Sequence, residues 1–136
     1  MIQAHLVAER DRLSFFPAMF GPRLMMRGEA LVYSWMDRLS DDYRGGFWNF
    51  YSLSNGGFYL APESAKNFHL FVESNGFEGE LSADAAGIVA TLFAFNSLAA
   101  ENFNGAAGDA MADRYHFLLK FARGHVEAGQ IFAAID

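Results

Sequence analysis

Residues 82–101 read SADAAGIVATLFAFNSLAAE, and this stretch decides the fold. The polar residues between positions 83 and 100 are only Asp84, Thr91, Asn96 and Ser97. A helix over this stretch is therefore apolar on almost every side. Ser82 suits the N-cap, and Asp84 places a carboxylate at the positive end of the helix dipole. The apolar part, residues 85–100, is shorter than the roughly 20 residues that cross a bilayer, so the pattern predicts a buried central helix.

Two aromatic-rich hairpins precede this helix. The first joins residues 47–54 to residues 58–61 across Asn55-Gly56, and the second joins residues 67–73 to residues 77–81 across Asn75-Gly76. Aromatic residues favour strands, and an Asn-Gly step is a strong signal for a hairpin turn. We expect these strands to form a four-stranded antiparallel sheet with meander topology.

Helical patterns flank the hairpins and the central helix. Gly21-Pro22 marks a break in secondary structure before a helix. Residues 23–40 then have helical periodicity, with one apolar stripe. The stripe consists of Met25, Leu31, Val32, Trp35, Met36 and Leu39, opposite Arg23, Arg27, Ser34 and Arg38. Residues 110–123 and 126–135 read as two further helices, separated near Gly124. The predicted fold class is therefore α+β, a four-stranded antiparallel meander packed with about four helices in a single domain of residues 1–136.

The composition excludes several kinds of chemistry. With 136 residues and 52% hydrophobic content, the chain can bury a sizeable core. It has no cysteine, hence no disulfide, no thiolate zinc site and no cysteine nucleophile, which fits a reducing compartment. Residues 1–12 mix charges and lack the apolar run of a secretory signal, so we expect a cytoplasmic protein.

The net charge of −6 is distributed unevenly. Acids and bases cancel in residues 1–44, whereas no Lys or Arg occurs between Lys66 and Arg114. That base-free stretch carries Glu73, Glu78, Glu80, Asp84, Glu101, Asp109 and Asp113. Such a surface repels nucleic acid, so direct DNA binding is not expected.

No catalytic or metal-binding constellation is recognisable in the sequence. The histidines are His5, His69, His116 and His125, and their spacing matches no metal-ligand pattern. No serine stands in a nucleophile elbow, and the glycine pairs lack the Lys-Ser/Thr of a phosphate loop. We therefore expect no catalytic residue, no metal and no cofactor.

Aromatic side chains crowd residues 43–59, namely Tyr43, Phe47, Trp48, Phe50, Tyr51, Phe58 and Tyr59. Stacking on nucleic-acid bases requires a basic groove, and no Lys or Arg lies between Arg44 and Lys66. The aromatic residues occupy both odd and even positions of the strands, so their side chains point to both faces of the sheet. Either helices cover both faces, or one face leaves an exposed patch that meets a partner. The alternative is a ligand pocket near Trp48 and Tyr59, which would make the chain a small-ligand-binding protein or an enzyme.

The second hairpin gives the sharpest local hypothesis. If Asn75-Gly76 forms a two-residue turn, Glu73 lies opposite Glu78. One face of the hairpin then carries His69, Phe71, Glu73, Glu78 and Glu80. These carboxylates either stay solvated or bind a partner, and both interpretations stand at the level of sequence.

Five motifs are spread over residues 13–136. They are Met25-Met26-Arg27-Gly28-Glu29-Ala30-Leu31, Gly45-Gly46-Phe47-Trp48, Tyr51-Ser52-Leu53-Ser54-Asn55-Gly56-Gly57-Phe58-Tyr59, Ser82-Ala83-Asp84-Ala85-Ala86-Gly87-Ile88-Val89-Ala90-Thr91 and Ile131-Phe132-Ala133-Ala134-Ile135-Asp136. In these motifs the chain resembles the KlcA/ArdB family of antirestriction proteins. The most specific parts are Ser-Asn-Gly-Gly-Phe-Tyr and Ser-Ala-Asp-Ala-Ala-Gly.

The resemblance implies a small bacterial protein, carried by plasmids and other mobile elements, that protects incoming DNA from type I restriction enzymes without catalysis. It also implies an α+β fold of an antiparallel sheet and several helices. DNA mimicry is disfavoured, because a duplex presents one charge per roughly 1.7 Å of its axis. This chain carries only −6 in total and balances its first third.

We therefore expect a monomeric inhibitor that touches a type I restriction enzyme complex, or a host factor controlling it, and that contacts no membrane. The residues expected at the contact are Glu78, Glu80, Asp84 and Asp136. Structural explanations compete for two of them, because Asp84 also serves its helix dipole and Asp136 is also a solvated terminus.

Overall fold

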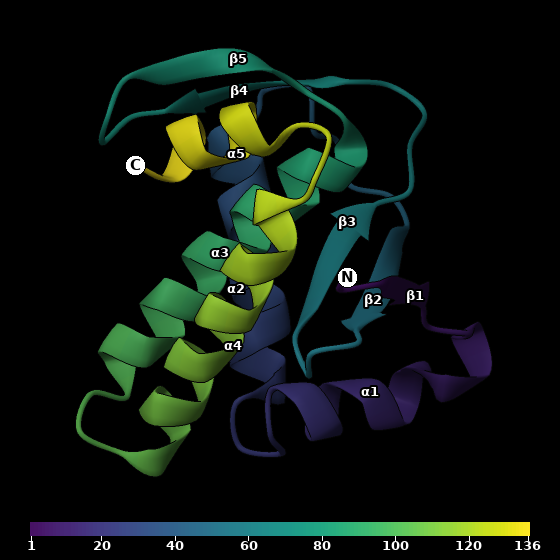
Figure 1. The fold of residues 1–136 in the computed structure, drawn as a ribbon, viewed down its shortest axis with the longest axis vertical. Coiled ribbons are helices and arrows are strands. Elements are labelled where there is room, and N and C mark those ends of the chain that lie inside the picture. Colours follow the sequence, from purple (N-terminus) through teal and green to yellow (C-terminus); the bar gives the residue numbers. More distant parts are fainter.

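The computed structural model describes all 136 residues, whose elements surround helix α3 (Figure 1). The chain begins with β1 (Ala4–Leu6), the 3-10 helix η1 (Glu9–Asp11), α1 (Arg12–Met19) and α2 (Met25–Leu39). The strands β2 (Trp48–Leu53), β3 (Phe58–Pro62), β4 (Phe68–Val72) and β5 (Phe77–Leu81) follow. The helices α3 (Ala83–Glu101), α4 (Ala106–Arg123) and α5 (Ala128–Ile135) complete the fold.

Helix α3 is the centre of the core, as its apolar sequence predicts. It packs against α2, α4 and β3, and most of its residues are buried. The Ser82 hydroxyl oxygen caps it by accepting a 3.1 Å hydrogen bond from the Ala85 N–H. By length and composition alone α3 would suit a membrane, but 67% of its apolar window is buried inside this fold. It is therefore a core helix here.

Helix α2 buries one face, also as predicted. Leu31, Val32, Met36 and Leu39 are buried. Arg27, on the opposite face, is exposed and forms a bidentate ion pair with Glu101, with N···O distances of 3.1 and 2.7 Å. An arginine from a distant part of the sequence thus neutralises one carboxylate of the base-free stretch.

A glycine and a threonine let α3 run along the outer edge of β3. A Cβ at Gly87 would lie 2.4 Å from both the Ala61 Cα and the Leu60 carbonyl oxygen, so only glycine permits this approach. One turn later, the Thr91 hydroxyl accepts a 3.2 Å hydrogen bond from the Leu60 N–H. The helix thus satisfies a backbone group that a neighbouring strand would otherwise bind.

The strands form two sheets, so the prediction of one four-stranded meander is wrong. The first sheet has the order β1-β2-β3, and the second contains only β4 and β5, with all pairs antiparallel. Because α3 occupies the outer edge of β3, β4 cannot pair there, and the second hairpin lies apart from the first sheet (Figure 1). The remaining edge of β2 is taken by β1, which is too short to give a strand pattern in the sequence.

The turn between β4 and β5 is longer than the predicted two-residue turn. Phe71, rather than Glu73, lies opposite Glu78. The reason is Asn75, whose side-chain oxygen accepts a 2.9 Å hydrogen bond from the Phe77 N–H and so favours a longer turn. The predicted opposition of two glutamates is therefore corrected.

Helix α1 was missed at the level of sequence because Pro17 stands inside it and imitates a helix stop. Its Phe15 ring lies 5.5 Å from the Phe58 ring and helps to cover one face of the first sheet. On the other face, the Tyr59 ring stacks on Phe121 of α4 at 5.7 Å. Helices thus cover both faces of the aromatic hairpin. The fold has five α-helices rather than about four, and α4 begins at residue 106 rather than 110.

Candidate protein-contact surface

The outer face of the β4–β5 hairpin carries four exposed side chains, which are His69, Phe71, Glu78 and Glu80. The His69 Nε2 lies 2.8 Å from a carboxylate oxygen of Glu78. The Phe71 side chain leaves about half of its surface, 48%, exposed. This face therefore offers carboxylates and an aromatic ring to a partner, and we call it the hairpin face.

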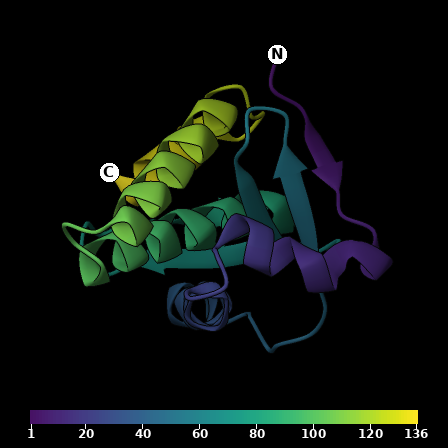
Figure 2. The same ribbon diagram turned by 90° about the horizontal axis from the view of Figure 1, so that it is seen from below.

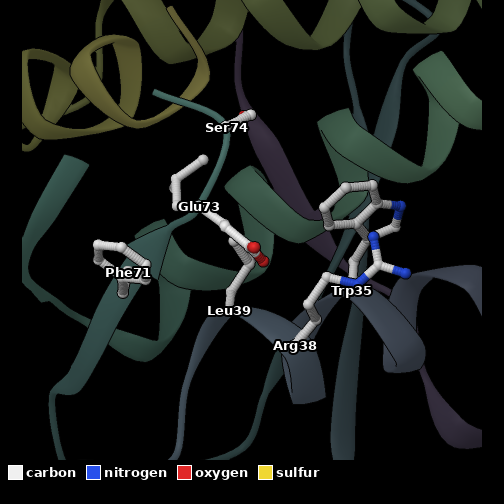
Figure 3. Close-up of a pocket in the computed structure, with 7 residues that line it drawn as sticks. Trp35, Arg38, Leu39, Phe71, Glu73 and Ser74 are labelled. Carbon is white, nitrogen blue, oxygen red and sulfur yellow. The ribbon is translucent and has the colours of Figure 1, made fainter. Parts of the chain in front are cut away.

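A groove of about 460 Å³ adjoins the hairpin face between α2 and the end of β4 (Figure 3). It is lined by Trp35, Arg38, Leu39, Phe71, Val72, Glu73 and Ser74. Trp35 is held in place because its ring stacks on Phe93 at 4.6 Å and its Nε1–H donates to the Ser97 hydroxyl at 3.2 Å. The Arg38 guanidinium lies 4.5 Å from the centre of the Trp35 ring.

Figure 3 shows the carboxylate of Glu73 between the Trp35–Arg38 pair and Phe71. The groove thus has aromatic walls and an arginine, residue types that are enriched in protein interfaces, together with one carboxylate. By helical periodicity Trp35 belongs to the core stripe and Arg38 to the opposite face. Their spacing of three residues on a helix is the signal that would have paired them.

Asp84, in the first turn of α3, joins three elements. One of its oxygens accepts a 2.7 Å hydrogen bond from the Tyr59 hydroxyl of β3, and the other accepts a 2.8 Å bond from His125 Nε2, beyond α4. Burial raises the pKa of Asp84, but the bonds from His125 and Tyr59 outweigh it, so the pKa lies below its ordinary value. Burial and the Asp84 carboxylate hold the pKa of Tyr59 well above its usual range. Asp84 is thus an ionised acceptor between two donors.

Glu127 extends this network from the turn between α4 and α5. Its carboxylate accepts hydrogen bonds from the Ser82 N–H, at 2.9 Å, and from the Ser82 hydroxyl. Its own N–H donates to His125 Nδ1 at 3.0 Å. Because Nδ1 accepts this bond, the ring presents its Nε2–H to Asp84. The network is therefore a clasp that fastens the α4–α5 turn to the start of α3.

Asp136 lies at the turn of the second hairpin. The Asn75 side-chain amide donates to the Asp136 backbone carbonyl at 2.9 Å. The structure thus brings two of the four predicted contact residues, Glu78 and Glu80, together on β5 and links Asp136 to the turn of the same hairpin. Asp84 lies apart from them, in the clasp.

The aromatic pocket expected near Trp48 and Tyr59 is divided. Trp48 borders an open pocket of about 310 Å³ that also includes Tyr43, whose hydroxyl accepts a 3.0 Å hydrogen bond from Trp48 Nε1. Tyr59 leaves only 2% of its surface exposed and points its hydroxyl at Asp84. The two rings therefore do not converge on one ligand site.

Comparisons with known proteins place the chain among close relatives. The sequence profile of a family described as antirestriction protein matches residues 41–136. The antirestriction protein KlcA of Escherichia coli is 62% identical over 135 residues, which are 99% of this chain and 95% of the relative. The putative antirestriction protein YubI of Escherichia coli strain K12 is 38% identical, over 96% of this chain and 93% of the relative.

A solved structure shares the fold along nearly the whole chain. It matches with a TM-score of 0.93 at 61% sequence identity, over 99% of this chain and 95% of the other. It belongs to a study of the KlcA and ArdB proteins, which show a novel fold and antirestriction activity against type I DNA restriction systems in vivo but not in vitro.

Proposed function

The chain belongs to the antirestriction protein family, and we propose that it inhibits type I restriction-modification systems and so protects incoming plasmid or phage DNA. The observation that carries the proposal is the 62% identity to KlcA over 99% of the chain. Only 40 of 136 residues are buried, so identity of this extent also covers much of the surface. A surface contact that serves the relatives is therefore expected to be retained.

Protein contact, rather than catalysis or DNA mimicry, is the mode of action in this proposal. A mimic of duplex DNA requires a row of free negative charges. Here Glu101 is paired with Arg27, and both oxygens of Asp84 accept hydrogen bonds from Tyr59 and His125. The activity of the relatives in vivo but not in vitro also fits an inhibitor that needs a further component of the cell.

The proposed contact surface is the hairpin face together with the adjoining groove between α2 and the end of β4, which we call the Trp35–Arg38 groove. Glu78 and Glu80 supply its carboxylates, and Asp136 lies beside the hairpin turn, where its backbone carbonyl accepts from Asn75. Asp84 acts indirectly in this proposal, because both of its oxygens already accept hydrogen bonds. We assign it the role of a positioning residue that holds the α4–α5 turn and, through α5, the C-terminus.

The partner in this proposal is the type I restriction enzyme complex or a host factor that controls it. We place the protein in the cytoplasm, where incoming DNA is cleaved, as a monomer without a cofactor. A single cluster of 33 buried residues supports one antirestriction domain over residues 1–136. Because α3 is used by that core, no membrane contact is proposed.

Plating efficiency of unmodified phage tests the function. Cells with an active type I system are challenged with and without the protein, and the protein is expected to raise plating. Equal plating in the two cultures contradicts the proposal. A strain without the restriction system is the control, because plating there should not change.

Adding the purified protein to purified restriction enzyme then separates the two classes of partner. Inhibition of DNA cleavage in this mixture indicates direct contact with the enzyme complex. Protection that occurs only in cells indicates a host factor, which should co-purify with the wild-type protein.

A further inference from the structure

Helices α1 and α2 leave large apolar side chains outside the core. Leu13 of α1 is 93% exposed, Met26 of α2 is 79% exposed, and Phe47, just before β2, is 82% exposed. Single exposed apolar residues are common on protein surfaces, but a group of them around a hollow marks an interaction site.

These three exposed side chains line two adjoining hollows. Leu13 and Met26 line a hollow of about 330 Å³ between α1 and α2, and Phe47 lines one of about 310 Å³ beside β2. Arg12 and Phe50 line both hollows, so the two adjoin at this pair of residues. Figure 2, which views α2 nearly end-on, shows α1 crossing beside the first sheet. We call the combined hollow the Arg12 groove.

Arg12, which lines both hollows, has no hydrogen-bond or ion-pair partner within the protein. Its guanidinium lies 4.6 Å from the centre of the Phe50 ring, and its Nε is buried without a hydrogen-bond acceptor. Folded proteins satisfy nearly all such buried donors, so an exception calls for an explanation. Glu29 lines the same groove, but its carboxylate accepts the Tyr33 hydroxyl at 2.7 Å and forms no bond with Arg12.

The chemistry of the groove selects its occupant. Exposed leucine, methionine and phenylalanine side chains match an apolar segment of another protein. The unpaired guanidinium matches a carboxylate, which it binds through two parallel N–H···O bonds. A nucleic acid fits poorly, because a phosphate backbone requires several cations and this groove contains one, next to Glu29.

We propose that the Arg12 groove binds an apolar protein segment that carries a carboxylate, and that Arg12 pairs with this carboxylate. The inference rests on the proposed function, because the partner is the protein whose contact gives protection. It adds a second contact surface, which offers an arginine where the hairpin face offers carboxylates. The terminal nitrogens of Arg12, which form no hydrogen bond within the protein, then bind the carboxylate of the partner.

Two sets of variants test the groove in the plating assay. Leu13→Ser with Met26→Ser removes its apolar walls, and Arg12→Met keeps much of the side-chain volume while removing the charge and the unmet donor. Each is expected to lower protection by at least about tenfold, the loss expected when an interface anchor is removed. The matched control is Phe103→Ser with Val126→Ser, at residues that are 80% and 94% exposed and lie outside the groove.

The melting temperature separates a binding role of Arg12 from a structural one. If Arg12 serves binding, Arg12→Met melts at the same or a higher temperature than wild type, because the unmet donor is gone, yet protects poorly. If Arg12 serves only the fold, the variant melts lower and loses protection only in proportion to the lost folded protein. Should Arg12→Met fail to fold, the Leu13 and Met26 variant decides.

Site-specific photocrosslinking gives a second readout. A benzoyl-phenylalanine at position 26 is expected to yield one discrete protein adduct in cells with the type I system, and Arg12→Met should abolish it. An adduct with nucleic acid or with a second copy of this chain contradicts the proposal. If the wild-type protein protects and both groove variants protect equally well, the proposed groove contact is also contradicted. A wild type that does not protect instead contradicts the proposed function, and the crosslink then decides the groove alone.

Discussion

At the scale of single residues, Gly87 marks the close approach of α3 to β3. A Cβ there would overlap the backbone of Leu60 and Ala61 at 2.4 Å, and neither backbone can move without shifting β3. Gly87→Ala is therefore expected to destabilise the protein by about 2 to 3 kcal/mol, although alanine favours helices by about 1 kcal/mol. Urea denaturation measures this difference.

Gly129, in α5, is the matched control for this substitution. A Cβ added there meets no atom within 4 Å. Gly129→Ala should therefore stabilise the protein by about 0.5 to 1 kcal/mol through helix propensity. Equal effects of the two substitutions would contradict the close approach of α3 to β3.

The Asp84 clasp predicts how stability depends on pH. Since hydrogen bonds lower the pKa of Asp84 in the folded protein, its carboxylate stabilises the fold above the unfolded pKa of about 4. This contribution disappears as the pH falls through the folded pKa. Asp84→Asn is expected to cost about 1 kcal/mol at pH 7, a low value for charge-assisted bonds because the side chain is partly exposed.

Thermal denaturation between pH 3 and pH 8, the range that brackets an ordinary Asp of about 4, checks this prediction. The gap between wild type and Asp84→Asn should narrow as the pH falls below about 4. Asp37→Asn, an exposed change on α2, is the control and should show no such trend. A gap that stays constant down to pH 3 would contradict the clasp.

At the scale of elements, sequence patterns located both hairpins and the central helix but could not assign the strands to sheets. The Asn-Gly steps are local signals, so Asn55-Gly56 and Asn75-Gly76 fall in the observed turns. The division into two sheets depends on Gly87 and Thr91 lying against Leu60, which is a contact between residues far apart in the sequence. No periodicity in either segment contains that information.

The free edge of β4 is protected in a way that its sequence does not indicate. The Asp42 carboxylate accepts a 2.8 Å hydrogen bond from the His69 N–H at this edge. A charged side chain on an edge strand hinders pairing with another chain. Asp42 therefore helps to keep the edge of β4 from pairing with another chain.

Asn75 couples the second hairpin to α5, and removing it is expected to loosen both elements. Its amide donates to the carbonyls of Ala134 at 3.0 Å and Asp136 at 2.9 Å, and its oxygen accepts from Phe77. Asn75→Ala should cost about 1 to 2 kcal/mol and speed amide hydrogen exchange in α5 and β5. Asn67→Ala, at an exposed position before β4, is the control. Unchanged exchange in α5 would show that Asn75 does not hold the C-terminus.

At the scale of the whole molecule, the charge imbalance was readable from the sequence, but the distant partners of its carboxylates were not. Arg27 reaches Glu101 across more than half of the chain, and His125 reaches Asp84 across the α3–α4 pair. The Trp35–Arg38 groove likewise combines α2 with the end of β4. Glu78 and Glu80 could be predicted on one exposed face because that depends on strand parity alone. These ion pairs, hydrogen bonds and the groove could not, because each joins elements that are far apart in the sequence.

The position of the charges, rather than their number, should determine protection. Glu78→Gln with Glu80→Gln removes two negative charges from the hairpin face, and Asp109→Asn with Asp113→Asn removes the same charge from exposed positions of α4. A protein contact at the hairpin face predicts that the first pair lowers plating of unmodified phage by about tenfold or more while the second pair leaves it unchanged. A DNA mimic acts through its summed negative field, so it predicts similar losses from both pairs. Because neither pair lies in the core, both double variants should melt at the same temperature as the wild type. Equal losses of protection would instead support DNA mimicry by the carboxylates of the base-free stretch.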